Sequence, residues 1–271
     1  MRALMMTKKA GWLPALCFTA DQANSTVALN KLGTPAEVTL EISTDGKTWS
    51  DYTFAGNGDG TTLNLTNVWD KVYMRNKSEN ATSFSTSTNN RYQFDISWQV
   101  RCSWDVTYLL CKNGTDTLLG GYCFTYLFFQ CLWLITAPSL PATTLTGSCY
   151  QRMFYGCTNL TTAPSLPATT LIDYCYAYMF YSCENLITLP QLPATTLPIQ
   201  CYYQMFRYCS KIKLSAYQDS DYTQAYRIPT EWTWTEWSNS VYRMFTSTWW
   251  TWGSSPQINT TYYLHKDNTI V

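Results

Sequence analysis

The chain has 271 residues, which is room for one or two domains. Hydrophobic residues make up 46% and charged residues only 13%, so the composition excludes an intrinsically disordered chain. Basic and acidic residues number 18 each, and a formal net charge of zero argues against nucleic acid as a partner. The chain lacks an apolar run of about 18 residues, so we expect no membrane insertion.

Residues 1–14 are expected to be a leader or a disordered start. Arg2, Lys8 and Lys9 precede the apolar stretch AGWLPALCFTA, which is a weak secretory-signal pattern. The alternative is that LCFTA simply begins the first strand of the folded protein. Both interpretations stay open.

Residues 15–108 carry the alternating, β-branched and aromatic pattern of strands. Asp45-Gly46 and the glycine-rich run 57–60 are turn signals between them. Strands at such close spacing predict an all-β sandwich domain. The expected strands are Ser25–Leu32, Ala36–Ile42, Trp49–Phe54, Thr61–Leu65, Lys71–Asn76 and Arg91–Val100.

Residues 109–214 repeat with a period of 26. Leu-Pro-Ala-Thr-Thr-Leu recurs at 140–145, 166–171 and 192–197. Such a period predicts stacked units that present an extended binding surface. Eight cysteines share the period, namely Cys123, Cys149, Cys175 and Cys201, then Cys131, Cys157, Cys183 and Cys209.

Each unit is expected to have a helical half and an extended half. At about 100° per residue, Cys149, Met153, Phe154 and Cys157 fall on one side of a helix. The prolines that follow favour a short extended strand. The predicted fold is therefore a mixed α/β repeat behind the sandwich. Besides the eight cysteines, the expected repeat core comprises Met153, Phe154, Leu160, Met179, Phe180, Leu186, Met205 and Phe206.

The segments Met153–Leu160 and Met179–Leu186 carry a Met-Phe pair, a cysteine three residues later, and then a polar pair and leucine. This pattern resembles the BspA-like leucine-rich repeats, a bacterial subclass. The resemblance covers about four units and implies a leucine-rich-repeat solenoid on a cell-surface binding protein. A fifth, displaced unit is expected at Val241–Phe245. It lies within residues 215–271, the expected C-terminal cap, whose best strand candidates are Tyr217–Arg227 and Ile258–Leu264.

Eleven cysteines are an odd number, so they cannot all pair within one chain. Two cysteines eight residues apart on a helix would lie about 12 Å apart, beyond disulfide reach. We expect free, buried thiols that act as small hydrophobes. The alternative, a metal site, lacks a Cys-x-x-Cys pair and has only His265 as an imidazole ligand. No metal or cofactor is therefore predicted.

Seven tryptophans stand where turns usually carry glycine: Trp69, Trp232, Trp234, Trp237, Trp249, Trp250 and Trp252. Three interpretations stay open. They form an exposed patch that binds sugar, lipid or protein, or they pack within the cap. Otherwise they record a reassigned codon that means glycine and was translated as tryptophan.

No set of residues with catalytic spacing is evident, so we expect no enzymatic activity. A Ser-His-Asp or Cys-His site would need His265, which we expect to lie in a polar, solvated tail. There is neither a pair of carboxylates in an apolar setting nor a glycine-rich phosphate loop.

The expected binding faces are the two sides of the repeat array. Thr136, Thr161, Thr162 and Thr188 should line an open face, and Tyr155, Tyr178 and Tyr181 the opposite side. Hydroxyls and rings with few charges favour a protein or glycan surface as partner.

The leading hypothesis is an extracellular recognition or adhesion protein that binds host or bacterial surfaces. The alternatives are a virion component, such as a phage fibre or decoration protein, and an intracellular interaction module or inhibitor. Self-association through an open end is possible in each case.

Overall fold

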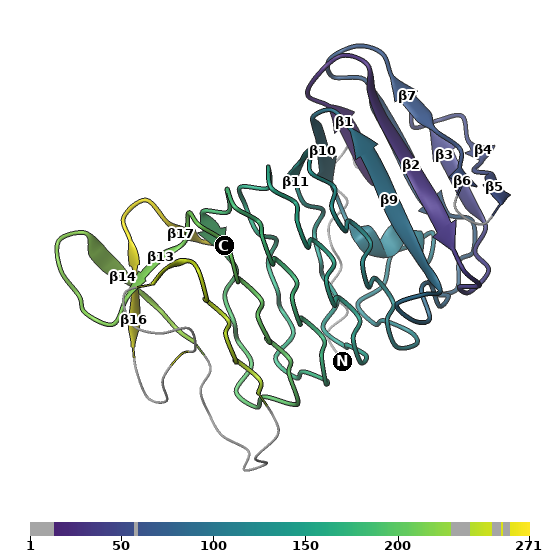
Figure 1. Cartoon of the computed structure of the whole chain (residues 1–271). Helices are drawn as coiled ribbons and strands as arrows, with labels where there is room; N and C mark the ends of the chain where they lie inside the picture. Colours follow the sequence, from purple (N-terminus) through teal and green to yellow (C-terminus); the bar gives the residue numbers. More distant parts are fainter. Residues whose placement is uncertain (1–13, 57–58, 229–238, 251–255, 257–260) are drawn as a thin grey trace.

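A computed structural model of the chain describes residues 14–56, 59–228, 239–250, 256 and 261–271. A β-rich unit lies at one end, the repeats form a stack in the middle, and a small sheet lies at the other end (Figure 1). The expected leader, apart from its last residue, falls outside the described residues, as do Trp232, Trp234, Trp237 and Trp252.

The N-terminal unit consists of two main sheets. The larger has the order β11 (Leu134–Thr136), β10 (Val100–Ser103), β1 (Leu16–Ala20), β8 (Lys71–Asn76), β3 (Leu40–Ser43) and β4 (Ser50–Asp51). The smaller consists of β7 (Leu63–Leu65), β2 (Ser25–Leu32) and β9 (Arg91–Ser97), and β5 (Phe54–Gly56) pairs with β6 (Asp59–Gly60). Strands β2 and β8 have the bounds expected from sequence. Alternate residues of β9 are buried, as in a sheet with one face on the core.

The predicted mixed α/β leucine-rich-repeat solenoid was wrong. Among the described residues there is no α-helix, only the four-residue 3₁₀ helix η1 (Val106–Leu109), and the strands form small, separate sheets. The segments expected to be helical are runs of consecutive turns, which we call turn runs.

Hydrogen bonding explains why the turn runs are not helices. The N–H groups of Gln151 and Met153 donate to carbonyls three residues back, at 3.1 Å in each case. The N–H groups between and after them, on Arg152 and Phe154, donate instead to Ala177 and Met179 in the next unit, at 2.9 and 3.0 Å. An α-helix would satisfy all of these donors within its own segment. Here every second donor depends on a neighbouring unit.

The backbone dihedral angles are a second, independent indication that a turn run is not an α-helix. Every fourth residue of a turn run has a positive φ, as at Ser148, Arg152 and Gly156, with φ of 56°, 54° and 73°. A right-handed helix contains no such residues. Side chains spaced by four therefore share one side, and this spacing resembles the helical period of 3.6 over a short segment. The sequence therefore predicted which positions are buried, but it did not predict the backbone conformation at those positions.

A row of phenylalanines runs through the repeats into the N-terminal unit. Phe128, Phe154, Phe180 and Phe206 stack with ring centroids 5.4–5.6 Å apart and nearly parallel planes. The row continues from Phe128 to Phe94 on β9, at 5.0 Å. The N-terminal unit and the stack therefore share one hydrophobic core.

Cysteine thiols follow the same row. The thiols of Cys157, Cys183 and Cys209 each donate to a phenylalanine carbonyl of the preceding unit, at 3.0–3.1 Å. Cys131 makes the equivalent bond to Phe94 at 3.3 Å, so the first unit is tied to β9 in this way too. All eleven cysteines are free and buried.

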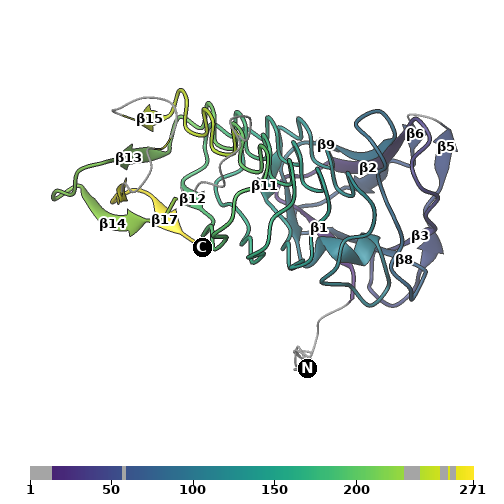
Figure 2. The ribbon, with the colours of Figure 1, turned by 90° about the horizontal axis from the view of Figure 1, so that it is seen from below.

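Both ends of the stack are paired with neighbouring elements. Strand β11 of the first unit lies parallel to β10 and thereby extends the larger sheet. At the other end, the displaced unit at Val241–Phe245 continues the stack, since Phe206 N–H donates to Met244 at 2.9 Å. Figure 2 shows the turn runs side by side between the two β-rich ends.

The C-terminal end adds two small sheets. One has the order β14 (Tyr222–Tyr226), β16 (Tyr262–His265), β13 (Lys213–Ser215) and β15 (Trp249–Trp250). The other pairs β12 (Thr188–Leu189) with β17 (Thr269–Ile270). The chain end therefore returns to the third unit and covers part of its surface.

Replacing Gly156 by alanine should lower the free energy of unfolding if the segment is a turn run and raise it if the segment is an α-helix. At a φ of 73° the added Cβ is strained, and we expect a loss of about 1–2 kcal/mol in the free energy of unfolding. In an α-helix the same change would stabilise the protein by about 1 kcal/mol. Ser182→Gly, at the equivalent position of the next unit with a φ of 57°, should stabilise. Denaturant unfolding measures both, and a more stable Gly156→Ala variant would contradict the turn run.

Candidate ligand-binding surface

Partly exposed rings and guanidinium groups line one side of the turn runs. We call this set the tyrosine–arginine strip: Arg91, Tyr126, Phe129, Arg152, Tyr155, Tyr178, Tyr181, Tyr203, Arg207, Tyr208, Tyr242 and Arg243. Two sets of its members occupy equivalent positions of successive units, because the turn runs stack in register: Tyr126, Arg152 and Tyr178, and Phe129, Tyr155, Tyr181 and Arg207. It includes Tyr155, Tyr178 and Tyr181, which the sequence placed on this side of the array.

The first row of the strip passes through the residue before each Met-Phe pair. The guanidinium of Arg152 lies between two rings, 5.4 Å from Tyr126 and 4.3 Å from Tyr178, and donates to the Tyr126 hydroxyl at 2.8 Å. Tyr178 then contacts Tyr203 at 5.1 Å between ring centroids. Such cation–π contacts hold the guanidinium in a fixed place.

A second row passes through the residue after each phenylalanine of the core. The rings of Phe129 and Tyr155 lie 5.1 Å apart, and those of Tyr155 and Tyr181 only 4.5 Å apart and nearly parallel. Arg207 follows, 5.8 Å from Tyr181 and 4.7 Å from Tyr208. Burial raises the pKa of Tyr181 to about 12, so its phenol stays a neutral hydrogen-bond donor at physiological pH.

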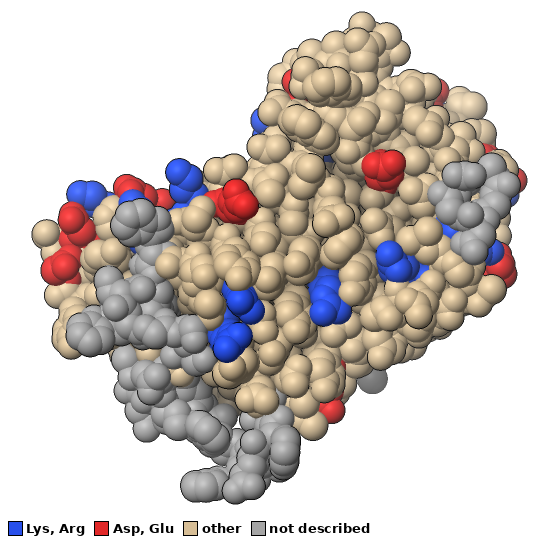
Figure 3. All heavy atoms as spheres, in the orientation of Figure 1, with Lys and Arg blue, Asp and Glu red and all other residues tan. Residues whose placement is uncertain are grey.

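The charge on the strip is positive. None of the ion pairs found among the described residues includes Arg91, Arg152 or Arg207. The Nε of Arg207 is buried without a hydrogen-bond partner. Figure 3 shows basic side chains in a row across one face of the molecule, with the acidic side chains outside that row.

Three of the four threonines proposed for an open face take part in hydrogen bonds with other segments. Thr136 donates to the carbonyl of Cys102 on β10 at 2.8 Å, and the hydroxyls of Thr188 and Thr269 lie 2.8 Å apart. Thr161 is half-buried and its carbonyl accepts from the N–H groups of Ile187 and Thr188. Only Thr162, of the four, is exposed. Strand β10 of the N-terminal unit and the C-terminal strand β17 therefore each engage one of the four threonines.

The residues proposed for the repeat core are all buried. They are Cys123, Cys131, Cys149, Met153, Phe154, Cys157, Leu160, Cys175, Met179, Phe180, Cys183, Leu186, Cys201, Met205, Phe206 and Cys209.

Tryptophans lie in several distinct settings. Trp69 is 66% exposed and has a φ of 74°. Trp249 and Trp250 form β15, which lies parallel to β13. Sequence reasoning passed over Trp98, which is 47% exposed and 5.7 Å from Trp133 between ring centroids.

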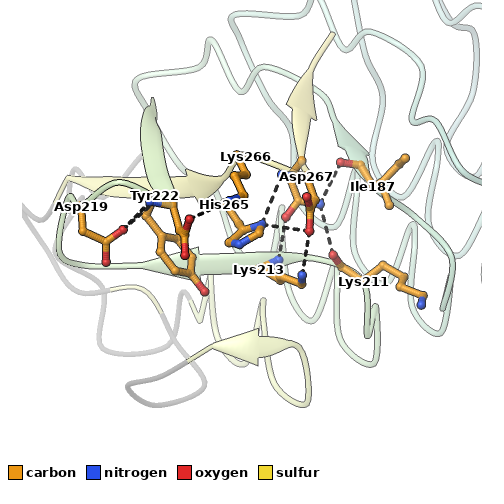
Figure 4. Close-up of polar contacts among 10 residues, drawn as sticks. Ile187, Lys211, Lys213, Asp219, Tyr222, His265, Lys266 and Asp267 are labelled. Carbon is orange, nitrogen blue, oxygen red and sulfur yellow. Dashed lines mark hydrogen bonds and ion pairs between the residues drawn. The ribbon is translucent and has the colours of Figure 1, made fainter.

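His265 does not lie in a solvated tail, contrary to expectation. It belongs to β16, its side chain is only 12% exposed, and its ring packs edge-on against Tyr222 (Figure 4). Its Nδ1 lies 3.1 Å from an oxygen of Asp267, which also binds Lys213. The neighbouring Asn268 bonds to Ile187, Lys211 and Lys213, so this cluster ties the chain end to the stack.

Other candidate sites have their polar groups already engaged. A shallow pocket beside β14 contains Arg227, whose guanidinium donates to the carbonyls of Leu192 and Ala194. Burial raises the pKa of Asp105 to about 6, but this carboxylate caps η1 by accepting from Thr107. Within the described residues, no three His, Cys, Asp or Glu side chains cluster as metal ligands. No helix of the described part is long and apolar enough to cross a membrane.

Comparisons with known proteins found no matching family model, no matching curated protein and no matching solved structure.

The thiols should be unreactive in the folded protein. Burial raises the pKa of the Cys175 thiol to about 12, and it raises those of Cys157 and Cys209 well above their ordinary value. The reactive thiolate is therefore scarce at pH 8. We expect Ellman's reagent to detect almost no thiol in the native protein and all eleven in guanidinium chloride. Rapid reaction of several native thiols would contradict this packing.

Proposed function

We propose that the chain is a non-enzymatic recognition protein that binds a protein or glycan surface through the tyrosine–arginine strip. The observation that carries this proposal is the continuity of the strip, from Arg91 on β9 to Arg243 in the last turn run. Tyrosine and arginine are the residues enriched in interfaces. The surrounding rings and hydrogen bonds also hold these side chains in place before a ligand arrives, which reduces the entropy lost on binding.

The rigidity of the surface supports the same proposal. Tyr155 and Tyr181 stack on each other, and Arg152 is fixed between two rings. Their backbones are fixed by hydrogen bonds between units. A long ligand would therefore meet an ordered row of side chains.

The resemblance to BspA-like repeats remains a proposal based on the Met-Phe and cysteine register. An extracellular or virion location fits a recognition surface of this kind, and we keep it as part of the proposal.

Array binding with matched variants tests the function. The full chain is applied to glycan and host-protein arrays, beside Tyr155→Ala/Tyr181→Ala and the control Tyr217→Ala. Tyr217 is 67% exposed but lies outside the strip. We expect the double variant to lose binding about tenfold or more, because two interface rings are removed, and the control to bind like the parent. Binding by no array member, or equal loss in the control, would count against the strip.

A further inference from the structure

The ring faces of the strip are mostly covered by other side chains. Tyr155 and Tyr181 cover each other at 4.5 Å, and the guanidinium of Arg152 covers Tyr178 at 4.3 Å. A neutral sugar that stacks on an aromatic ring needs an open face. The strip therefore offers hydroxyls and guanidinium N–H groups more than open rings.

The guanidinium groups are suited to anions. Among the described residues, the guanidinium groups of Arg152 and Arg207 donate to neutral oxygens, such as the hydroxyls of Tyr126 and Tyr208 and the amide of Gln204. Neither belongs to an ion pair of the described residues. A guanidinium held by cation–π contacts still presents N–H groups that bind a carboxylate in a bidentate manner.

The backbone of the strip leaves no room for an added peptide strand. Its N–H groups alternate between bonds within a turn and bonds to the next unit, as at Tyr155 and Phe154. A peptide that binds by adding a strand needs unpaired backbone groups. A linear ligand recognised by its side groups fits this surface better.

We propose that the tyrosine–arginine strip binds a linear acidic polysaccharide whose carboxylates pair with Arg152 and Arg207. This inference rests on the proposed function and narrows its ligand class. Hydroxyls of the sugar rings would bond with the phenols that lie between the arginines.

Calorimetry with paired polymers tests the proposal. Polygalacturonate is titrated into the full chain, beside its methyl-esterified form, which has the same backbone without the charge, and beside poly-L-glutamate. We expect polygalacturonate to bind, its affinity to fall with added salt, and the esterified polymer and the polypeptide not to bind. Arg152→Gln/Arg207→Gln should weaken binding at least about tenfold. Lys266→Gln, which removes a cation paired with Asp221 outside the strip, should not.

The outcomes separate the two levels of the proposal. Equal binding of the esterified polymer, or preference for poly-L-glutamate, overturns the acidic polysaccharide but leaves recognition by the strip intact. If no polymer binds here and nothing binds on the arrays, both proposals fail. Unchanged affinity of the double arginine variant overturns the assignment of the carboxylate contacts.

A separate observation concerns the tryptophans. Outside the turn runs, the described non-glycine residues with positive φ are Asn24, Trp69, Trp98, Trp104 and Asn239. Asparagine tolerates this conformation, whereas a bulky side chain costs about 1–2 kcal/mol there. Three tryptophans in such a small set call for a common cause.

The local geometry at Trp69 is that of a glycine turn. Asp70 N–H donates to the carbonyl of Asn67 at 3.2 Å, so Trp69 is the third residue of a four-residue turn. With a φ of 74° it occupies the position that a type II turn reserves for glycine. Trp98, with a φ of 59°, lies in the short connection between β9 and β10. Trp69 is 66% exposed, so packing does little to offset the strain there, whereas Trp98 is 47% exposed and contacts Trp133 at 5.7 Å between ring centroids.

We infer that positions 69 and 98 are glycine in the protein as its source organism makes it, through a codon that the organism reads as glycine. Trp104 has the same sign of φ, but its ring stacks on Tyr73 at 5.6 Å, so it tests the idea less cleanly. With glycine at position 98, the ring contact between Trp98 and Trp133 would be absent.

Peptide mass spectrometry of the protein from its native source decides the matter. We expect peptides that cover positions 69 and 98 to be lighter by the difference between tryptophan and glycine. Tryptophan masses at both positions overturn the inference.

In the recombinant chain, Trp69→Gly and Trp98→Gly should each raise Tm by roughly 2–4 °C. Trp49→Gly should lower Tm, because Trp49 has an ordinary φ and contacts Arg75 at 3.7 Å. A lower Tm for both test variants also counts against the inference.

Discussion

Backbone hydrogen bonds between units are the constraint on which this structure depends. In a turn run, every second N–H group finds its acceptor in the next unit, as from Arg152 to Ala177. An isolated unit would leave these donors unpaired and would also bear the strain of its left-handed residues. The units are therefore stable only as a stack, and the stack needs a neighbour at each end. At one end of the stack, strand β11 pairs with β10. At the other end, the last turn run accepts hydrogen bonds from the turn run before it.

The same constraint produces the candidate site. Units in register bring equivalent side chains into rows, inside as well as outside. Inside, the row contains Phe154 and Phe180 and the thiols that bond to their carbonyls. Outside, it contains Tyr155 and Tyr181, joined by arginines wherever the sequence supplies one. In such a recognition surface, the backbone register aligns the side chains in rows. The residues at a few variable outer positions then determine which groups a ligand can contact.

Much of the inner structure could be predicted from sequence, and the backbone could not. Cys149, Met153 and Cys157 recur with a spacing of four, which marks inward positions in a helix and in a turn run alike. Over nine residues, periods of 3.6 and 4 are hard to tell apart. Within the described turn runs, Gly156 is the one glycine with a positive φ, and Arg152 occupies the same conformation without being a glycine. Arg152 was also passed over as a site residue because its partners, Tyr126 and Tyr178, lie one unit away on either side. The contact between Thr188 and Thr269 could not be foreseen either, because β17 reaches Thr188 from 81 residues along the chain.

The displaced last unit shows what kind of variation this architecture tolerates. The hydrogen bond from Tyr150 to Cys175 spans 25 residues, whereas the equivalent bond from Tyr202 to Ser240 spans 38. The segment between two turn runs can thus lengthen by half a repeat while the turn runs keep their alignment. Inserts could accumulate in these connections during evolution, and units could be duplicated or lost, without disturbing the outer rows of rings and guanidinium groups. The length of the binding surface and the content of its loops would then be free to evolve separately.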